Sequence, residues 1–273
     1  MNLKIVMVEG AHDGAFISKV MQVNGYSTFS KPIDEYEPRM MAEYLKGQYK
    51  NAPVGELNLQ SVRQQILFPS YALASSNEIM LIFHMGGDRR SDRRSKLVKD
   101  LRDFFLSPAS RSTGVVSADD TLTFIYEFDA DKVGIDKRLK QAGNEIFQID
   151  EGFSGFQANA SYEVSNGLRW GVYIFADNSG KGKLEDIILP MMEKDNEDIA
   201  SCAKDYVDKR TTFVLFQTAK PTKDPEKARI GVMGQLQKAG TAIPAIIEQS
   251  SFLTDEKIKG SAICMEIFEF FAK

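Results

Sequence analysis

The feature that most constrains this chain is a recurring order of short apolar runs followed by amphipathic segments. Residues 3–8 form an apolar run interrupted only by Lys4, and the run ends at Glu9 and Gly10. From residue 13 apolar side chains recur at helical spacing, until Asn24 and Gly25 provide a typical helix stop. A buried strand, a tight turn and a helix form the opening unit of an α/β protein.

The same order returns along the chain. Three further apolar runs have the character of buried strands, and each is followed by a segment of helical pattern; the runs are 79–85, 122–128 and 168–175, with a shorter strand expected at 147–149. The expected helices begin near the ends of these strands and continue toward the C-terminus; they are 91–105, 135–142, 184–193, 196–208, 225–238 and 255–271, with an ambiguous apolar run at 213–216. Alternating strands and helices predict an α/β fold with a mostly parallel central sheet flanked by helices.

One segment interrupts this order. Residues 26–77 carry mixed signals, with expected helices over 38–49 and 57–67 and with prolines and glycines around them. We therefore expect one domain over residues 1–273, in which residues 26–77 are an insertion or cap and residues 196–273 a mainly helical C-terminal extension.

Composition narrows the functional classes. The chain has 34 Lys and Arg against 38 Asp and Glu and a net charge of -4, so a nucleic-acid or membrane partner requires a local basic patch. Two cysteines and two histidines are too few for a zinc cluster and indicate a reducing compartment. The N-terminal apolar run is too short for a signal peptide, and no stretch reaches the roughly 20 apolar residues of a membrane span. We expect a soluble, cytoplasmic protein without a membrane partner.

Acidic side chains follow two of the expected strands. Glu9 follows the first strand and Asp13 lies shortly after it, while Asp129 and Asp131 close the third. The carboxyl ends of strands in an open α/β sheet border the ligand crevice, so these side chains are expected to share one site. Clustered carboxylates repel one another unless a cation lies between them. Oxygen ligands without imidazole or thiolate suit Mg²⁺ or Mn²⁺, and such sites carry out phosphoryl chemistry.

These residues resemble the TOPRIM fold, the metal-binding domain of topoisomerases, bacterial primases, small RNA-maturing nucleases and overcoming-lysogenization-defect nucleases. The motifs that carry the resemblance are Glu9-Gly10-x-x-Asp13, then Gly86-Gly87 after the second strand, then Asp129-Ala130-Asp131. The chain is still more similar to a family of uncharacterised bacterial and archaeal TOPRIM-like proteins, through residues 170–178, 182–186 and 227–228. The resemblance extends over nearly the whole chain. It implies that Glu9 is the general acid/base and that Asp129 and Asp131 bind the metal. Asp13 is a further candidate ligand because of its position near the end of the first strand.

The same resemblance implies two further site residues, Glu185 and Lys227. In two-metal nucleases an acid after the fourth strand holds a second cation, and Glu185 is the chosen ligand, with Asp177 as its competitor. Glu185 also has a plain reading, because an acid in a first helical turn complements the helix dipole. Lys227 is expected to stabilise phosphate charge, the alternative being a solvated helix residue. The loop 176–183 lacks the Walker A spacing, but its backbone N–H groups and Lys181 can meet a phosphate.

A basic run follows the second strand. Residues 88–102 contain seven basic and three acidic side chains. Arginine and lysine contacts to phosphate supply most sequence-independent affinity for nucleic acid, and the expected contacts are Arg89, Arg90, Arg93 and Arg94. A solvated helix face that pairs its own charges is the equal alternative.

The leading hypothesis is a Mg²⁺- or Mn²⁺-dependent phosphodiester hydrolase, a nuclease acting on DNA or RNA. Topoisomerase and primase are disfavoured because the chain has no large strand-passage domain and no zinc-binding module. The alternative is a non-catalytic TOPRIM-like module that binds metal, nucleotide or protein in a larger system such as a defence system, with an ATPase as the expected protein partner. Hydrolysis of a small nucleotide is a third reading, with residues 26–77 as the cap. The number of metals and the oligomeric state stay open.

Overall fold

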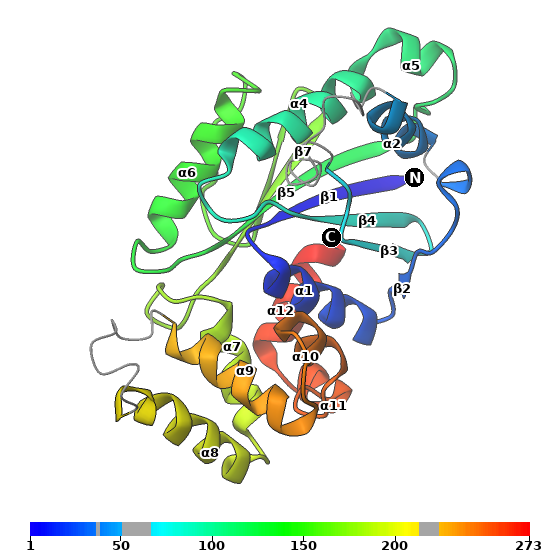
Figure 1. Ribbon diagram of the computed structural model, residues 1–273. Helices are drawn as coiled ribbons and strands as arrows, with labels where there is room; N and C mark the ends of the chain where they lie inside the picture. Colours follow the sequence, from blue (N-terminus) through cyan, green and yellow to red (C-terminus); the bar gives the residue numbers. More distant parts are fainter. Residues whose placement is uncertain (37–38, 51–66, 213–223) are drawn as a thin grey trace. The chain divides into compact units, whose positions relative to one another are not determined.

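The first apolar run of the sequence becomes the centre of a seven-stranded sheet. The computed structural model describes residues 1–36, 39–50, 67–212 and 224–273. The strand order is β2-β3-β4-β1-β5-β7-β6 (Figure 1). The middle strand β1 (Asn2–Val8) pairs in parallel with β4 (Glu78–His84) on one side and with β5 (Thr121–Asp129) on the other. These three strands are buried along almost their whole length, which is why each reads as a continuous apolar run.

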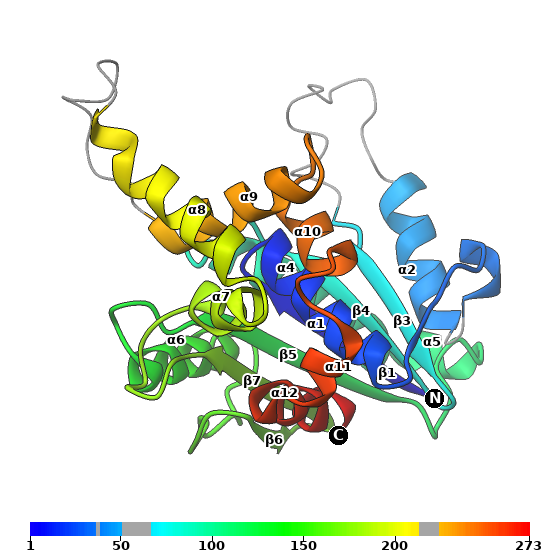
Figure 2. The same ribbon diagram turned by 90° about the horizontal axis from the view of Figure 1, so that it is seen from below.

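Antiparallel strands form both edges of the sheet. On one edge β3 (Tyr71–Ser75) pairs with β4, and β2 (Ser27–Thr28) pairs with β3. On the other edge β6 (Ser161–Ser165) and β7 (Leu168–Phe175) form a hairpin. The turn residues Asn166 and Gly167 have φ of 49° and 77°, as a tight hairpin turn requires. The α/β prediction is thus confirmed as a mixed sheet with a parallel centre, seen from below in Figure 2.

The segment 26–77, expected to be an insertion or cap, supplies β2, β3, the short helix η1 (Ile33–Glu35) and α2 (Arg39–Lys50). The helix expected over 38–49 is therefore confirmed from residue 39 on. All but the last residue of the helix expected over 57–67, and the whole apolar run at 213–216, lie outside the described residues.

The chain divides into two compact units, of which the first is Met1–Gly14, Gly25–Phe128 and Ile135–Ile174. Its helices include α4 (Ser91–Leu106), α5 (Pro108–Ser112) and α6 (Ile135–Phe147). The strand expected at 147–149 is wrong, because α6 runs to Phe147 and the chain then turns, with Asp150 N donating to Ile146 O. In the core Trp170 stacks on Phe124 at 5.2 Å between ring centroids and donates to Asp150.

The second unit is Ala15–Asn24, Asp129–Gly134 and Phe175–Lys273, and it is mainly helical. Helix α1 (Ala11–Val23) begins in the first unit and continues in the second. The other helical elements are α7 (Leu184–Glu193), α8 (Glu197–Asp208), η2 (Lys209–Thr212), α9 (Pro225–Gln237), α10 (Ile243–Gln249), α11 (Asp255–Lys259) and α12 (Ala262–Ala272). Helix α9 packs against α7, α8 and α10. The helical C-terminal region is therefore confirmed.

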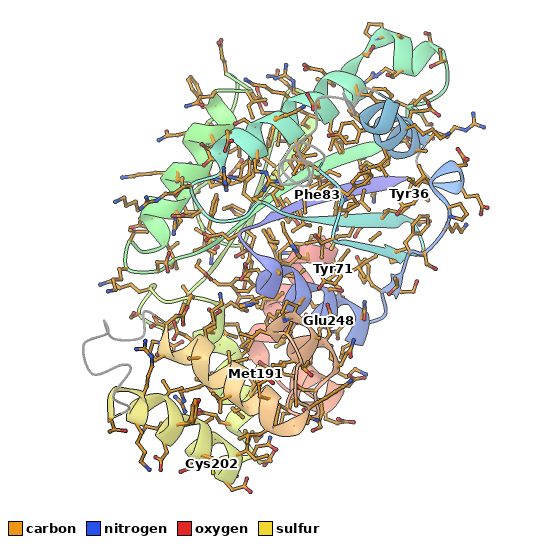
Figure 3. The ribbon with its side chains drawn as sticks, viewed as in Figure 1. Tyr36, Tyr71, Phe83, Met191, Cys202 and Glu248 are labelled. Carbon is orange, nitrogen blue, oxygen red and sulfur yellow. The ribbon has the colours of Figure 1, made fainter. Side chains whose placement is uncertain are left out.

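The single helix expected over 255–271 is two helices. Gly260 ends α11, and the Ser261 hydroxyl accepts a hydrogen bond from Cys264 N to begin α12. A serine cap satisfies a backbone N–H that has no partner within its helix, so the chain restarts there. Both cysteines are free: Cys264 is buried, and Cys202 is exposed on α8 (Figure 3). Among the described helices, none has the length and apolar character needed to cross a membrane.

Candidate metal centre

Three carboxylates come together where β5 ends. Asp13, Glu127 and Asp129 each offer one carboxylate oxygen, and these oxygens all lie within 4.8 Å of one another. Glu127 and Asp129 are two residues apart on β5, so they lie on the same face of the strand. Asp13 comes from the first turn of α1. Asp13 and Glu127 are 5% and 1% exposed, so water screens their charges poorly.

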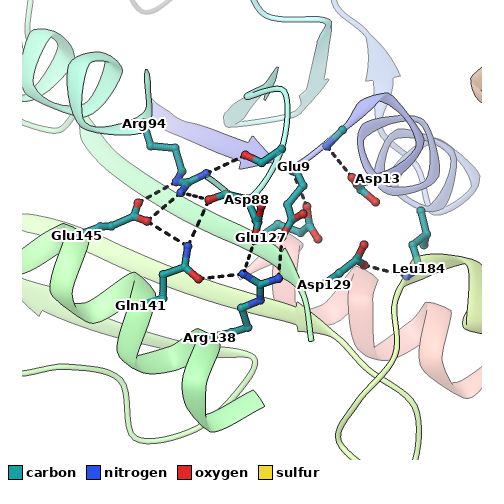
Figure 4. Close-up of polar contacts among 12 residues, drawn as sticks. Glu9, Asp13, Asp88, Arg94, Glu127, Asp129, Arg138, Gln141, Glu145 and Leu184 are labelled. Carbon is teal, nitrogen blue, oxygen red and sulfur yellow. Dashed lines mark hydrogen bonds and ion pairs between the residues drawn. The ribbon is translucent and has the colours of Figure 1, made fainter. Parts of the chain in front are cut away.

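Main-chain N–H groups hold each of these carboxylates. Gly10 N donates to Asp13 Oδ2 at 2.7 Å, and Glu9 N donates to Glu127 Oε2 at 3.2 Å. Within the second unit, Leu184 N donates to Asp129 Oδ1 at 2.9 Å (Figure 4). Such donors stabilise the charged form of a carboxylate and fix its orientation. The cluster is therefore ordered by backbone that the strand ends and helix starts provide.

The Gly-Gly motif after β4 has a direct structural reason. The N–H groups of Gly86 and Gly87 donate to the Glu9 carbonyl at 3.0 and 2.8 Å. Their φ angles are 87° and 115°, in the region that favours glycine. These two residues thus tie the carboxyl end of β4 to that of β1, immediately beside the cluster.

Arg138 and Arg94 of the first unit belong to a polar network in which Arg138 lies near Glu9 (Figure 4). Arg138, on α6, lies 3.8 Å from Glu9 Oε1 and 3.1 Å from Asp88 Oδ2. Arg94 forms two 2.8 Å hydrogen bonds with the two oxygens of Glu145 and is 1% exposed. Both guanidinium groups lie near the ring of Phe128, at 4.9 Å for Arg94 and 5.8 Å for Arg138. Arg94 is therefore part of the interior of the first unit.

This changes the expectation for the basic run. Arg94 was expected to contact phosphate, but its buried pairing with Glu145 leaves it no access to a ligand at the surface. Arg93 is half-buried and donates to the Met85 carbonyl at 2.8 Å. Arg89 and Arg90 are exposed. Two of the four arginines thus keep the exposure that a phosphate contact requires.

Glu127, and not the predicted Asp131, lies with Asp13 and Asp129 in the carboxylate cluster. Asp131 is exposed, with φ of 49°, and its backbone pairs with Gly182 in an isolated bridge. It is not among the three clustered carboxylates of the described residues, whereas Glu127 is. Glu127 was not predicted from the sequence, although an acid two positions before Asp129 in an apolar strand is a usable signal.

The later candidates meet within the second unit. Glu185, in the first turn of α7, is 4% exposed, and Lys227 Nζ lies 3.6 Å from its Oε1. Lys227 stands in the first turn of α9, where its N–H donates to the capping side chain of Asp224. The two expected site residues are thus brought together as an ion pair. Lys181 is exposed in the preceding loop.

Asp177, the competitor of Glu185, is engaged in its own loop. Its Oδ1 accepts hydrogen bonds from Ser179 N, Ser179 Oγ and Lys181 N at 2.7, 2.6 and 3.2 Å. These bonds, from Ser179 above all, lower the pKa of Asp177. The Asp177 side chain therefore fixes the conformation of its own loop.

His84 is the last residue of β4 and is half-buried. Its ring lies edge-on to Tyr71 at 5.8 Å, and its Nε2 is buried without a hydrogen-bond partner in the described ranges. Burial lowers the pKa of His84 from 6.5 to about 4. A Cβ on Gly14 would overlap this ring, which explains the glycine inside α1.

The fold and the site together define an α/β protein with a buried carboxylate cluster at the carboxyl end of a parallel strand pair. Residues 3–269 match the family model described as "Protein of unknown function (DUF3226)", and the chain belongs to this family. Its fold is similar to that of hypothetical protein PH0156 from Pyrococcus horikoshii OT3, with a TM-score of 0.54, 16% identity, and coverage of 100% of this chain and 95% of that chain. No curated protein matches the sequence. Neither description names the TOPRIM fold.

Proposed function

We propose that this protein is a Mg²⁺- or Mn²⁺-dependent phosphodiester hydrolase acting on nucleic acid through a TOPRIM-like site. The observation that carries the proposal is the convergence of Asp13, Glu127 and Asp129, with oxygens within 4.8 Å of one another. Three carboxylates at this distance in a poorly solvated place repel strongly, and a divalent cation removes that repulsion. The meeting of three acids from β5 and α1 at one place favours a functional reason for the cluster.

The donor set fits a hard cation. At an ion–oxygen distance of about 2.1 Å, the oxygens of an octahedral Mg²⁺ are about 3.0 Å apart when adjacent and about 4.2 Å apart when opposite, so three oxygens within 4.8 Å of one another can bind one ion after moving inward. All three donors are carboxylate oxygens, which suit Mg²⁺ or Mn²⁺ better than zinc. Asp13, Glu127 and Asp129 are therefore the proposed ligands, and the bound cation would act as a Lewis acid toward a phosphate. Asp131, proposed from the sequence, is the weaker choice because it is exposed and outside the cluster.

Glu9 is the proposed general base. It ends β1 beside Glu127, and its side chain is 14% exposed, so water can reach it. The Arg138 guanidinium at 3.8 Å favours the ionised carboxylate, the form that accepts a proton from an attacking water. Arg138 is in turn held by Asp88 and Gln141, at 3.1 and 2.9 Å. The network thus supports Glu9 in a fixed position.

Glu185 is proposed as the ligand of a second cation, and Lys227 is proposed to stabilise the negative charge of a phosphate. Lys227 Nζ lies 3.6 Å from Glu185 Oε1, but its side chain is 44% exposed and its ammonium group has three N–H donors, so it can also meet a phosphate. A site with one cation, without Glu185 as a ligand, is the simpler form of the proposal. Exposed Arg89, Arg90 and Lys181 are proposed to contact the phosphates of the substrate.

A metal-binding module without hydrolysis is the second candidate. The burial of Arg94 and the net charge of -4 favour it, because both leave little positive charge for nucleic acid. In this case the partner is a protein, such as an ATPase, and the cation has a structural role.

One experiment separates the two candidates. Mn²⁺ binding is measured by calorimetry, and cleavage is measured on single- and double-stranded DNA and RNA with Mn²⁺ or EDTA. We expect saturable binding and Mn²⁺-dependent cleavage in the parent, with both lost in Asp129→Asn and retained in Asp198→Asn, an exposed acid on α8. Saturable binding that requires Asp129, with no cleavage of any of these substrates, would support the module instead.

A further inference from the structure

A cavity lies in the first unit, between helix α6 and the loop 151–157. It has a volume of about 450 Å³, within the range of small-ligand sites. None of its lining residues belongs to the carboxylate cluster or to the Arg138 network. Its chemistry is set by the aromatic side chains Phe147, Phe153 and Phe156, the polar side chains Lys140, Asn144 and Gln157, and one exposed carboxylate, Asp136, which is four residues before Lys140 on α6.

Aromatic side chains provide a surface for a flat ring. Phe147, in the last turn of α6, is 53% exposed, so its ring is accessible to a ligand. Phe153 packs edge-on to Phe156 at 5.0 Å and to Trp170 at 6.2 Å, so this wall is anchored in the core. An exposed ring beside an anchored aromatic pair can stack a planar ligand at little cost in side-chain entropy.

Polar groups line the same cavity and narrow the ligand class. Asn144 and Gln157 are exposed amides, which both donate and accept hydrogen bonds, as the edges of a nucleobase require. Lys140, also exposed, brings a positive charge suited to a phosphate. A planar ring with polar edges and an attached anion is the chemistry of a nucleotide.

The register of α6 links this cavity to the proposed site. Lys140, Asn144 and Phe147 follow one another at helical spacing, whereas Arg138 and Glu145 face the network around Glu9. Arg138 and Asn144 are about 9 Å apart along the helix axis, the length of a few stacked nucleotides at about 3.4 Å each. One rigid helix thus serves both places.

We propose that this cavity is a subsite that stacks one base of a single-stranded nucleic acid on Phe147 and holds its phosphate with Lys140. The inference rests on the proposed function and names the part of the substrate that binds away from the carboxylates. A free nucleotide offers the same base and phosphate, so the test includes both sources.

The test measures binding in EDTA, where hydrolysis cannot occur. Fluorescence anisotropy with labelled single-stranded DNA and RNA oligonucleotides gives the affinity, and adenosine monophosphate is titrated separately by calorimetry. Phe147→Ala should weaken oligonucleotide binding roughly 10-fold, as the loss of one stacked base does. Lys140→Gln should lower the salt dependence of binding. Tyr206→Ala removes an aromatic side chain of similar exposure, 61%, from α8 and should leave the affinity unchanged.

Photocross-linking locates the base. Oligonucleotides that carry 5-bromouracil should cross-link to peptides containing Phe147 or Phe156. Parent affinity in Phe147→Ala, or cross-links confined to other peptides, would overturn the proposal. Binding of adenosine monophosphate that requires Phe147, without oligonucleotide binding, would overturn the assignment to a strand.

Failure of the proposed function is a separate result. A parent that never cleaves but binds oligonucleotides through Phe147 overturns the hydrolase and supports the subsite. Metal-dependent cleavage by the parent, together with unchanged oligonucleotide affinity in Phe147→Ala, supports the hydrolase and overturns the subsite.

Discussion

Replacing Glu127 by glutamine should have opposite effects on stability without and with metal. The change removes one of three clustered charges and keeps the shape of the side chain. Two unit charges at the 4.8 Å limit of the cluster repel by about 3.5 kcal/mol at an effective dielectric constant of about 20, and Glu127 has two such neighbours. Proton uptake and local relaxation relieve part of this repulsion, so we expect metal-free Glu127→Gln to be more stable than the parent by about 1–3 kcal/mol.

Metal should reverse the order. A cation at one hundred times its dissociation constant stabilises the parent by about 2.7 kcal/mol. For a chain of this size each kcal/mol raises the midpoint of thermal unfolding by about 2–4 °C. We therefore expect Mn²⁺ to raise the Tm of the parent by several degrees and to leave that of Glu127→Gln nearly unchanged.

Thermal and urea unfolding in EDTA and in Mn²⁺ measure both effects. Asp131→Asn is the matched control, because asparagine tolerates the φ of 49° at this exposed position. It should keep the stability and the Mn²⁺ response of the parent. The reasoning is refuted if Glu127→Gln is less stable than the parent in EDTA and still responds to Mn²⁺. Loss of the response in Asp131→Asn would instead restore the ligand pair predicted from the sequence.

Three further predictions concern the interior. Arg94→Met leaves Glu145 buried without the arginine that pairs with it and should lower the free energy of unfolding, measured in urea, by about 3–5 kcal/mol. The double variant Arg94→Met/Glu145→Met should recover most of this loss. A small loss in the single variant would argue against the buried pair. The pKa of His84 is lowered from 6.5 to about 4 in the folded protein, so the unfolded chain binds this proton at a higher pH than the folded chain does. The free energy of unfolding should therefore fall by about 1–2 kcal/mol, allowing for partial exposure, as the pH drops from 6.5 to about 4. His84→Gln should remove this part of the pH dependence, and an unchanged profile would contradict it. Gly143→Ala should stabilise α6 by about 0.5–1 kcal/mol, because the added Cβ meets only ordinary van der Waals contacts. Gly234→Ala should destabilise the protein by about 1–3 kcal/mol, because the added Cβ overlaps the buried Ile246 of α10. Equal effects of the two substitutions on the free energy of unfolding would refute the packing argument.

The central strands were predictable because their burial leaves a local signature. The runs at 3–8, 79–85, 122–128 and 168–175 correspond to β1, β4, β5 and β7 with ends shifted by at most one residue. A strand buried on both faces has to be apolar at every position. The strands β2, β3 and β6 lie at or next to the edges of the sheet, are exposed or only partly buried, and lack this signature, so they were missed. For β6 a usable signal existed in Asn166-Gly167, a sequence that favours a hairpin turn.

The candidate site was predicted in its location and only partly in its members. Glu9, Asp13 and Asp129 could be named because the ends of buried strands and the start of a helix are visible in the sequence. Whether the next ligand is Glu127 or Asp131 depends on where β5 ends and how the chain leaves it. Asp131 leaves the strand direction to pair with Gly182, a partner far along the chain.

The sequence by itself determined the α/β class, the central strands and the end of the sheet at which acids gather, because apolar periodicity and strand ends are local properties. The tertiary structure decided which charges are buried and what they meet. Arg94 reads as one of several solvated arginines until Glu145, 51 residues away, is packed against it. Glu127 reads as a lone acid in a strand until Asp13 is brought to it by the first turn of α1. Charge pairing depends on distance in space and on exclusion of water, and neither is set by neighbours in sequence.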